Sequence, residues 1–519
     1  MPRFPDFPDE VADLRSSTLA SPSIPRTQLW SRVSAVSELA LITLLTPVVL
    51  LVHGYHPFAD DAGIYVAGIR AMLNPQLFQV DADFVTAHTR LSVFSHVFAW
   101  TIRTFHLPLE LALLSAYLLS VFAFLLGSLR LAQRIFQDGV RPWGATLLAS
   151  VLFTLPVAAT ALTLMDPYVT ARSFSTPFSL FALAACMDRA WLRTAAWLLL
   201  VSLMHPLMGV YLAAFLLVYL LVSKEDWTWL IVTCVAAFLS AFVIYVWTMQ
   251  SALPQGYRVA ALSRGYFFLS CWHWFEWLGL ALPLLLMLVA VLRSENLAVR
   301  NLCLTCIATG TTAWLVSVCF IHTSGSFFLA RIQPLRTFQM IYLIGVLLLG
   351  GFLAHFFRGR LAIVGAGTLM FTAGLMMLVQ RQTYPASAHV EWPFAAPSNP
   401  WQQAFVWIRY NTPQNAIFAL DSNYTKSGAE DTQGFRATTA RSALVDDLKD
   451  GGVVAIFPAL APQWKKQRDL EEGLDGISDH ERMTRLKPMG VTWLLLRSSA
   501  TTQFDCPYRN SVVKVCRLP

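Results

Sequence analysis

The chain contains 519 residues, of which 56% are hydrophobic and 13% are charged, and its mean hydropathy is +0.53. Soluble domains carry roughly 25% charged residues, so this composition excludes a purely soluble protein, a disordered protein and a nucleic-acid-binding protein. The formal net charge is +7, and residues 1–383 hold 23 Lys and Arg against 17 Asp and Glu. Because these charges flank apolar segments, we interpret them as markers of membrane topology.

Residues 1–34 are polar, and no small-residue cleavage site follows the first apolar run. We therefore predict a cytoplasmic tail and then an uncleaved helix. Most of the apolar runs up to residue 383 approach the 20 or so residues that cross the hydrocarbon layer. The predicted all-α polytopic domain, 35–383, has about eleven transmembrane helices, at 36–53, 109–130, 144–165, 174–190, 194–204, 207–223, 228–249, 274–292, 302–321, 338–357 and 361–379.

The segment 194–223 contains His205-Pro206, so it forms either one long crossing or two short helices. Proline interrupts the helical hydrogen-bond ladder. The split also keeps a Lys or Arg in every inner loop, as the positive-inside rule prefers. With the N-terminus inside, we therefore predict that the outer face holds 54–108, 166–173, 250–273, 322–337 and the C-terminal region.

The first outer loop, 54–108, contains two amphipathic segments, Ala62–Leu73 and Leu91–Phe105. We expect both to be helices that lie in the membrane interface. The second segment is alternatively a short crossing. That topology would move the next basic loop, 130–141, to the outer face, against the charge rule.

Residues 384–519 begin with a proline-rich linker, and the rest is typical of a small extracytoplasmic α/β domain. We predict buried strands at Ala416–Leu420 and Val491–Leu496, an edge strand at Ser511–Leu518, and helices at Ala437–Lys449 and Gln463–Glu472. Cys506 and Cys516 can pair if this domain lies outside the cytoplasm. Its charged clusters are interpreted as solvated helix faces, namely Arg436, Arg441, Asp446, Asp447, Asp450, Lys465, Lys466 and Arg468.

Charged side chains near membrane depth need a physical reason, because burying them is costly. Four groups fall on the predicted outer face: His56 with Asp60 and Asp61, Asp166 with Arg172, His205 alone, and Arg331 with Gln333 and Arg336. A carboxylate can act as general base on an acceptor hydroxyl. Arginines can neutralise a phosphate as charge grows on it. This combination suits a reaction between a polar acceptor and a phosphate-bearing lipid.

Each group also has a structural interpretation. Asp60 and Asp61 could cap the helix Ala62–Leu73 by satisfying its free N–H groups. A turn, a hinge or headgroup anchoring is the alternative for the other charged members, Asp166, Arg172, His205, Arg331 and Arg336. Two arginines on the outer side run against the positive-inside pattern, which favours a phosphate site at Arg331 and Arg336.

The arrangement resembles the GT-C superfamily of integral membrane glycosyltransferases, which take a sugar from a polyprenyl-phosphate or diphosphate lipid at the outer face. The matching features are the acidic pair after the first helix, the two helices of the first outer loop, Asp166 after the third helix, the broken helix pair around Leu203–Gly209 and the terminal α/β domain. The stretches Asp166–Pro177 and Leu329–Arg336 also look like those of an uncharacterised bacterial membrane family.

The resemblance implies that Asp60 or Asp61 is the catalytic base and that Asp166 can help to bind a divalent metal. His205 stands where the superfamily often has a basic residue that meets the lipid phosphate. The resemblance also implies a bacterial inner membrane, a polyprenyl-phosphate-linked donor and a cell-envelope acceptor. The W-W-D-type signature of oligosaccharyltransferases is absent from the sequence, which argues against N-glycosylation of proteins.

We therefore predict a membrane glycosyltransferase with Asp60 and Asp61 as catalytic residues. The predicted substrate-binding residues are His56, Asp166, Arg172, His205, Arg331, Gln333 and Arg336. A transporter or flippase of an amphipathic lipid is the first alternative, although the sequence lacks an inverted internal repeat. A non-catalytic envelope scaffold is the second alternative.

Overall fold

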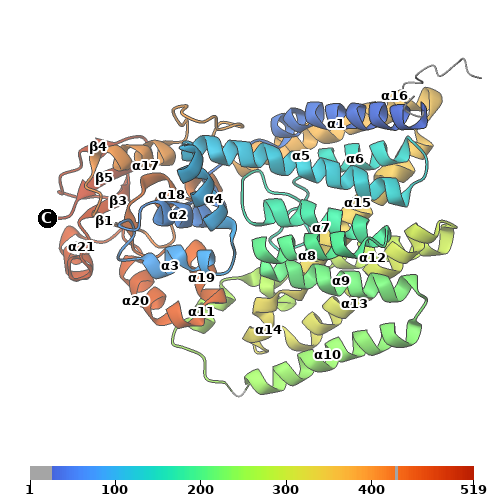
Figure 1. Ribbon diagram of the computed structural model, residues 1–519. Coiled ribbons are helices and arrows are strands. Elements are labelled where there is room, and N and C mark those ends of the chain that lie inside the picture. Colours follow the sequence, from blue (N-terminus) through green and yellow to red (C-terminus); the bar gives the residue numbers. More distant parts are fainter. Residues whose placement is uncertain (1–25, 250, 427–429) are drawn as a thin grey trace, which may run out of the picture.

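The computed structural model describes residues 26–249, 251–426 and 430–519, and it consists of a helical bundle joined to a smaller α/β region (Figure 1). The predicted tail, 1–34, lies mainly outside the described residues. Its last part belongs to helix α1 (Arg26–His53), which therefore begins earlier than the predicted first crossing.

Eight helical segments in the described part of the chain are long and apolar enough to cross a membrane. The first is Val36–His53 of α1. The others contain α5 (Leu109–Ile135), α9 (Pro206–Ser223), α10 (Trp227–Met249), α12 (Trp274–Arg293), α13 (Leu297–Phe320), α15 (Phe338–Phe356) and α16 (Ala362–Thr383). Many of their Leu, Val and Phe side chains are exposed, as lipid-facing surfaces require. The chain is therefore a multi-pass membrane protein.

The other three predicted crossings are shorter helices, α6 (Arg141–Val151), α7 (Arg172–Met187) and α8 (Trp191–Met204). The predicted helix 144–165 is wrong beyond Val151. Pro156 lacks an N–H and restricts the residue before it, so the helix does not continue. Instead the chain folds back, and Pro156 forms an antiparallel bridge with Thr163. This loop carries Asp166.

The predicted break at His205-Pro206 is confirmed. α8 ends at Met204 and α9 begins at Pro206, while His205 between them is extended, with φ −148° and ψ 93°. The two helices pack against each other. Gly209 permits this close approach, because a Cβ at that position would collide with Ser202. His205 therefore lies at the tip of a helical hairpin.

The first outer loop contains α2 (Ala62–Leu73), α3 (Ala82–Thr86) and α4 (Phe94–Phe105). The predicted interfacial position is wrong for α2. Most of its residues are buried, and it packs against α4 and against α18 (Phe435–Thr439) of the C-terminal region. By contrast, α4 exposes Trp100 and Phe105, which suits an interfacial helix.

The C-terminal region contains a five-stranded mixed sheet of order β2-β1-β3-β5-β4. Its strands are β1 (Ile417–Leu420), β2 (Ser442–Ala443), β3 (Trp493–Arg497), β4 (Tyr508–Arg509) and β5 (Val513–Arg517). β1 pairs in parallel with β2 and β3, and β5 pairs antiparallel with β3 and β4. The two predicted buried strands are therefore confirmed, but β5 is not an edge strand, because β4 covers its other side.

Helices surround this sheet: α17 (Pro400–Asn411), α18, α19 (Lys449–Ile456), α20 (Ala461–Glu471) and α21 (Asp479–Leu486). The predicted helix Gln463–Glu472 corresponds to α20. The predicted helix Ala437–Lys449 is wrong, because Ala440 adopts a left-handed conformation that ends α18, and β2 follows. Cys506 and Cys516 form a disulfide.

The C-terminal region covers one end of the helical bundle (Figure 1). Arg70 Nε of α2 donates a hydrogen bond to the Ala437 carbonyl at 2.5 Å. Gly434 fits against the Phe58 carbonyl, where a Cβ would collide. α11 (Tyr257–Leu262) also packs on α19. The covered end is the one at which the segments predicted on the outer face emerge.

Candidate functional site

A cavity of about 410 Å³ lies between the covered end of the bundle and α19. Its lining comes from the start of α2, the start of α7, the α8–α9 hairpin tip, the 264–267 segment, the segment before α15, and α19. Six of the nine predicted site residues line it, namely Asp61, Arg172, His205, Arg331, Gln333 and Arg336. Tertiary folding therefore brings together residues from loops that are far apart in the chain.

Asp60 and Asp61 form the acidic side of the site. Asp61 Oδ2 accepts a hydrogen bond from Arg172 Nη1 at 3.1 Å, and Asp61 Oδ1 lies 3.3 Å from Lys449 Nζ. Asp60 accepts a hydrogen bond from the Tyr168 hydroxyl at 2.5 Å and forms an ion pair with Lys449. The capping interpretation is wrong for Asp61, which precedes α2 but makes no side-chain capping bond.

The charges on this side depend on burial and on neighbouring groups. Burial disfavours the ionised form of Asp61, but Arg172 and Arg336 outweigh it and lower the pKa of Asp61 below its usual value. Burial lowers the pKa of Lys449 to about 7. Asp61 is therefore ionised at neutral pH, while the Lys449 amine changes charge near neutrality.

Asp166 lies behind the cavity wall and positions Arg172. Its Oδ2 accepts hydrogen bonds from Arg172 Nη2 at 3.0 Å and Nε at 3.3 Å, and its Oδ1 accepts one from the Thr163 hydroxyl at 2.9 Å. Both residues are buried. Arg172 thus bridges Asp166 and Asp61, and its orientation is determined from both sides.

The opposite side of the cavity is basic and carries Arg264, Arg331 and Arg336. Among the described residues, no carboxylate lies within ion-pair distance of these three guanidiniums. Nε of Arg331 and Arg336, and both Nε and Nη2 of Arg264, lack hydrogen-bond partners there. Buried donors without partners are costly, so this side is suited to an anionic ligand with several oxygens.

A tight turn positions two of these arginines. α14 (Phe327–Ile332) ends at Ile332, Gln333 follows with a left-handed φ of +48°, and Pro334 begins the next helical turn. The Tyr211 hydroxyl of α9 lies within hydrogen-bond distance of the carbonyls of Ile332 and Gln333 and shares its one proton between them. The turn therefore fixes the residues on both sides of it relative to α9.

The remaining basic groups of the cavity are histidines. His205 Nδ1 accepts a hydrogen bond from Met208 N at 3.5 Å, and burial lowers the pKa of His205 to about 3. Burial also lowers the pKa of His88, which lines the same cavity. His205 is therefore neutral at physiological pH and can act as a hydrogen-bonding group, while the arginines supply the positive charge.

His56 is the predicted binding residue that lies away from this cavity. Its Nδ1 lies 2.8 Å from Glu391 Oε1, and its ring stacks on Tyr384 with centroids 3.9 Å apart. Both partners belong to the linker that follows α16. In this structure His56 thus joins the first outer loop to the linker.

The acidic residues here do not form a metal-binding donor set. Among the described residues, no group of three or more His, Cys, Asp or Glu side chains is arranged to hold a metal ion. The oxygens of Asp166 face Thr163, Thr170 and Arg172.

A second, mostly apolar cavity of about 320 Å³ adjoins the charged one. It lies among α7, α9, α10, α13 and α15, and Val210 and Arg336 line both cavities. Its other lining residues include Leu212, Phe215 and Leu343. A charged chamber therefore borders an apolar chamber at Arg336.

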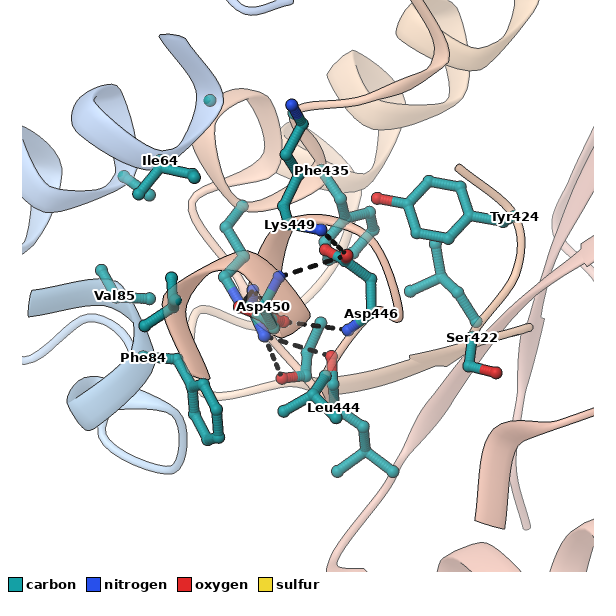
Figure 2. A pocket seen from close by; sticks show the side chains of 18 of the residues that line it. Ile64, Phe84, Val85, Ser422, Tyr424, Phe435, Leu444, Asp446, Lys449 and Asp450 are labelled. Carbon is teal, nitrogen blue, oxygen red and sulfur yellow. Dashed lines mark hydrogen bonds and ion pairs between the residues drawn. The ribbon is translucent and has the colours of Figure 1, made fainter. Parts of the chain in front are cut away.

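Three site residues were missed from the sequence. Arg264 had a signal, because it is a basic residue in a predicted outer loop. His88 and Lys449 had none, since local sequence does not reveal that they face Asp61. The solvated-face interpretation is wrong for Arg436, Arg441, Asp446, Asp447 and Asp450, which are largely buried. Figure 2 shows Asp446, Lys449 and Asp450 around a small cavity of about 50 Å³ beside the site.

Fold and site together define a multi-pass membrane protein with a charged cavity between its helical bundle and its α/β region. No protein-family model matches the chain, and no curated protein matches it.

Proposed function

We propose that the protein is a membrane glycosyltransferase. It transfers a sugar from a polyprenyl-phosphate-linked donor to a cell-envelope acceptor at the outer face of a bacterial inner membrane. In this proposal the bundle crosses the membrane eleven times, with the three shorter helices included, and the C-terminal α/β region lies outside.

The observation that carries the proposal is the pairing of opposite chemistries across one cavity. Asp61 faces it from one side, and Arg264, Arg331 and Arg336 face it without carboxylate partners among the described residues. The apolar cavity begins at Arg336. An anionic lipid needs a cationic group next to an apolar chamber, and an acceptor hydroxyl needs a nearby base.

The proposed reaction is a single displacement. The acceptor hydroxyl oxygen attacks the anomeric carbon of the donor sugar while Asp61, or Asp60 beside it, takes the hydroxyl proton. The bond between the anomeric carbon and the phosphate oxygen breaks, and its electron pair remains on the phosphate. Arg264, Arg331 and Arg336 stabilise the charge that develops there.

Native mass spectrometry of protein purified gently from its own membranes tests the lipid site. Wild type should carry a polyprenyl-phosphate adduct that Arg331→Ala/Arg336→Ala loses. Arg258→Ala is the matched control, because Arg258 is exposed on α11 and does not line the cavity. Ordinary phospholipid alone in all three proteins would contradict the proposal.

A transfer assay tests the base. Radiolabelled lipid-linked sugars extracted from the host strain are incubated with membranes that contain wild type or the Asp60→Asn/Asp61→Asn variant. Removal of a general base typically lowers the rate about 10²- to 10⁴-fold. Full activity in this variant would exclude both aspartates as the base.

A lipid transporter or flippase is the second candidate, favoured by the same adjoining polar and apolar cavities. It predicts movement of the intact lipid-linked sugar across proteoliposomes without transfer of label to an acceptor. Such movement, retained in Asp60→Asn/Asp61→Asn, would favour the transporter over the transferase.

A further inference from the structure

A separate cavity of about 600 Å³ lies between the first outer loop and the C-terminal region. Its walls come from residues 55–58, the first turn of α5, the linker at 387–399, and α17. It shares no lining residue with the charged cavity or with the apolar one.

Exposed aromatic side chains gather at this cavity. Trp392 is 54% exposed, Phe394 72% and Tyr410 74%, and all three line it. They are the exposed large hydrophobic side chains found between 384 and 519 in the described part of the chain. Large apolar side chains concentrated at one hollow mark a binding surface.

The charged groups of the cavity are balanced. Glu110 Oε1 lies 3.5 Å from Arg409 Nη1 and 3.8 Å from Arg70 Nη2. Glu391 is paired with His56 at 2.8 Å. Because each carboxylate already faces a basic group, the cavity offers no excess charge to an ionic ligand.

The cavity nevertheless offers hydrogen-bonding groups. Tyr55 is fully buried and lines the cavity, and its hydroxyl has no partner among the described residues. The Glu110 and Glu391 side chains are 24% and 22% exposed and retain acceptor capacity, and the exposed Trp392 and Tyr410 add an indole N–H and a hydroxyl. The amides of Asn399 and Gln402 are buried and bond within the protein. The lining thus combines aromatic faces with hydrogen-bond donors and acceptors.

We infer that this cavity is a binding site for a neutral oligosaccharide. Sugar rings present apolar C–H faces that pack on aromatic rings, and hydroxyls that bond to carboxylates and to hydroxyl groups. A lipid tail would leave the polar wall unsatisfied, and a charged ligand would compete with the existing ion pairs. The inference does not depend on the transfer reaction.

Isothermal titration of the full-length protein in nanodiscs tests this inference. The probes are neutral oligosaccharides of five to seven units: maltose-, cellulose-, xylose-, mannose- and N-acetylglucosamine-type. At least one should bind wild type. Trp392→Ala and Tyr410→Ala should each weaken that binding by tenfold or more. Trp274→Ala is the matched control, because Trp274 is 78% exposed on α12, away from the cavity.

Three results would overturn the inference. The first is the failure of every probe to bind folded wild type, and the second is binding that both cavity variants retain. The third is quenching of Trp392 fluorescence by brominated lipids in the nanodiscs, measured against Trp392→Phe. That quenching would mean that these aromatics insert into the membrane. Each of these results would leave the transferase proposal standing, since its tests use the charged cavity.

Discussion

Arginines in two regions of the chain differ in whether a carboxylate faces them. Arg436 forms ion pairs with Asp81 and Asp450 and donates to two backbone carbonyls. Arg264, Arg331 and Arg336 have no carboxylate partner among the described residues. The first arrangement is complete without a ligand, whereas the second leaves donors unsatisfied. The difference separates an arginine that stabilises the fold from arginines available to a ligand.

The largest expected effect is on the arginines without partners. Arg331→Ala/Arg336→Ala should lower sugar transfer at least 100-fold, because removal of one stabilising donor typically costs about 10²- to 10³-fold. The thermal unfolding midpoint should stay near that of wild type, since no ion pair is lost. Transfer rate and unfolding are measured on the same preparation. A large fall in the midpoint would place these arginines in the structural group.

Arg436→Met, by contrast, should lower the stability of the fold. It leaves Asp81 and Asp450 buried without their cation, which typically costs about 3–5 kcal/mol of stability. Denaturant unfolding of the solubilised protein measures the loss. Arg517→Met is the control, because the Arg517–Asp505 pair is exposed and such pairs contribute about 0–1 kcal/mol. Equal stabilities for the two variants would mean that the buried ion pairs of Arg436 contribute no more stability than an exposed pair.

Gly434→Ala tests the contact between the C-terminal region and the bundle. Gly434 has φ +86°, and a Cβ would collide with the Phe58 carbonyl. Gly473→Ala is the matched control, because Gly473 has φ +72° but open space around it. Backbone strain of this kind costs about 1–3 kcal/mol, and the collision should make Gly434→Ala the less stable variant in thermal unfolding. Equal stabilities would mean that the backbone around Phe58 shifts at little cost to accommodate the added methyl group.

The remaining effect concerns the pH dependence of stability. Because burial lowers the pKa of Lys449 from 10.5 to about 7, the unfolded state binds more protons than the folded state between those pH values. Stability contributed by this group therefore rises with pH across that window. Wild type should gain stability relative to Lys449→Met from pH 7 towards pH 10, followed by thermal unfolding. A parallel pH profile for wild type and Lys449→Met would contradict the lowered pKa of Lys449. Lys466→Met changes an exposed lysine and is the control, which should follow wild type.

Hydropathy and single residues were sufficient to predict most of the bundle. The long apolar runs became helices, and Pro206 separated α8 from α9. The same reasoning failed at 144–165, where Pro156 and the bridge to Thr163 replaced a helix. It also failed at α2, whose amphipathic pattern does not reveal that α18 covers it.

The sequence by itself determined which long segments are apolar enough to cross a membrane and which loops carry acidic and basic residues, because hydropathy and proline act within a few helical turns. Only the tertiary structure decided which charges are paired. Lys449 meets Asp60 across 389 positions of sequence, and Arg264 faces the cavity beside Arg331 without a carboxylate among the described residues. Coulombic interaction and hydrogen bonding depend on separations of a few ångströms, which sequence distance does not report.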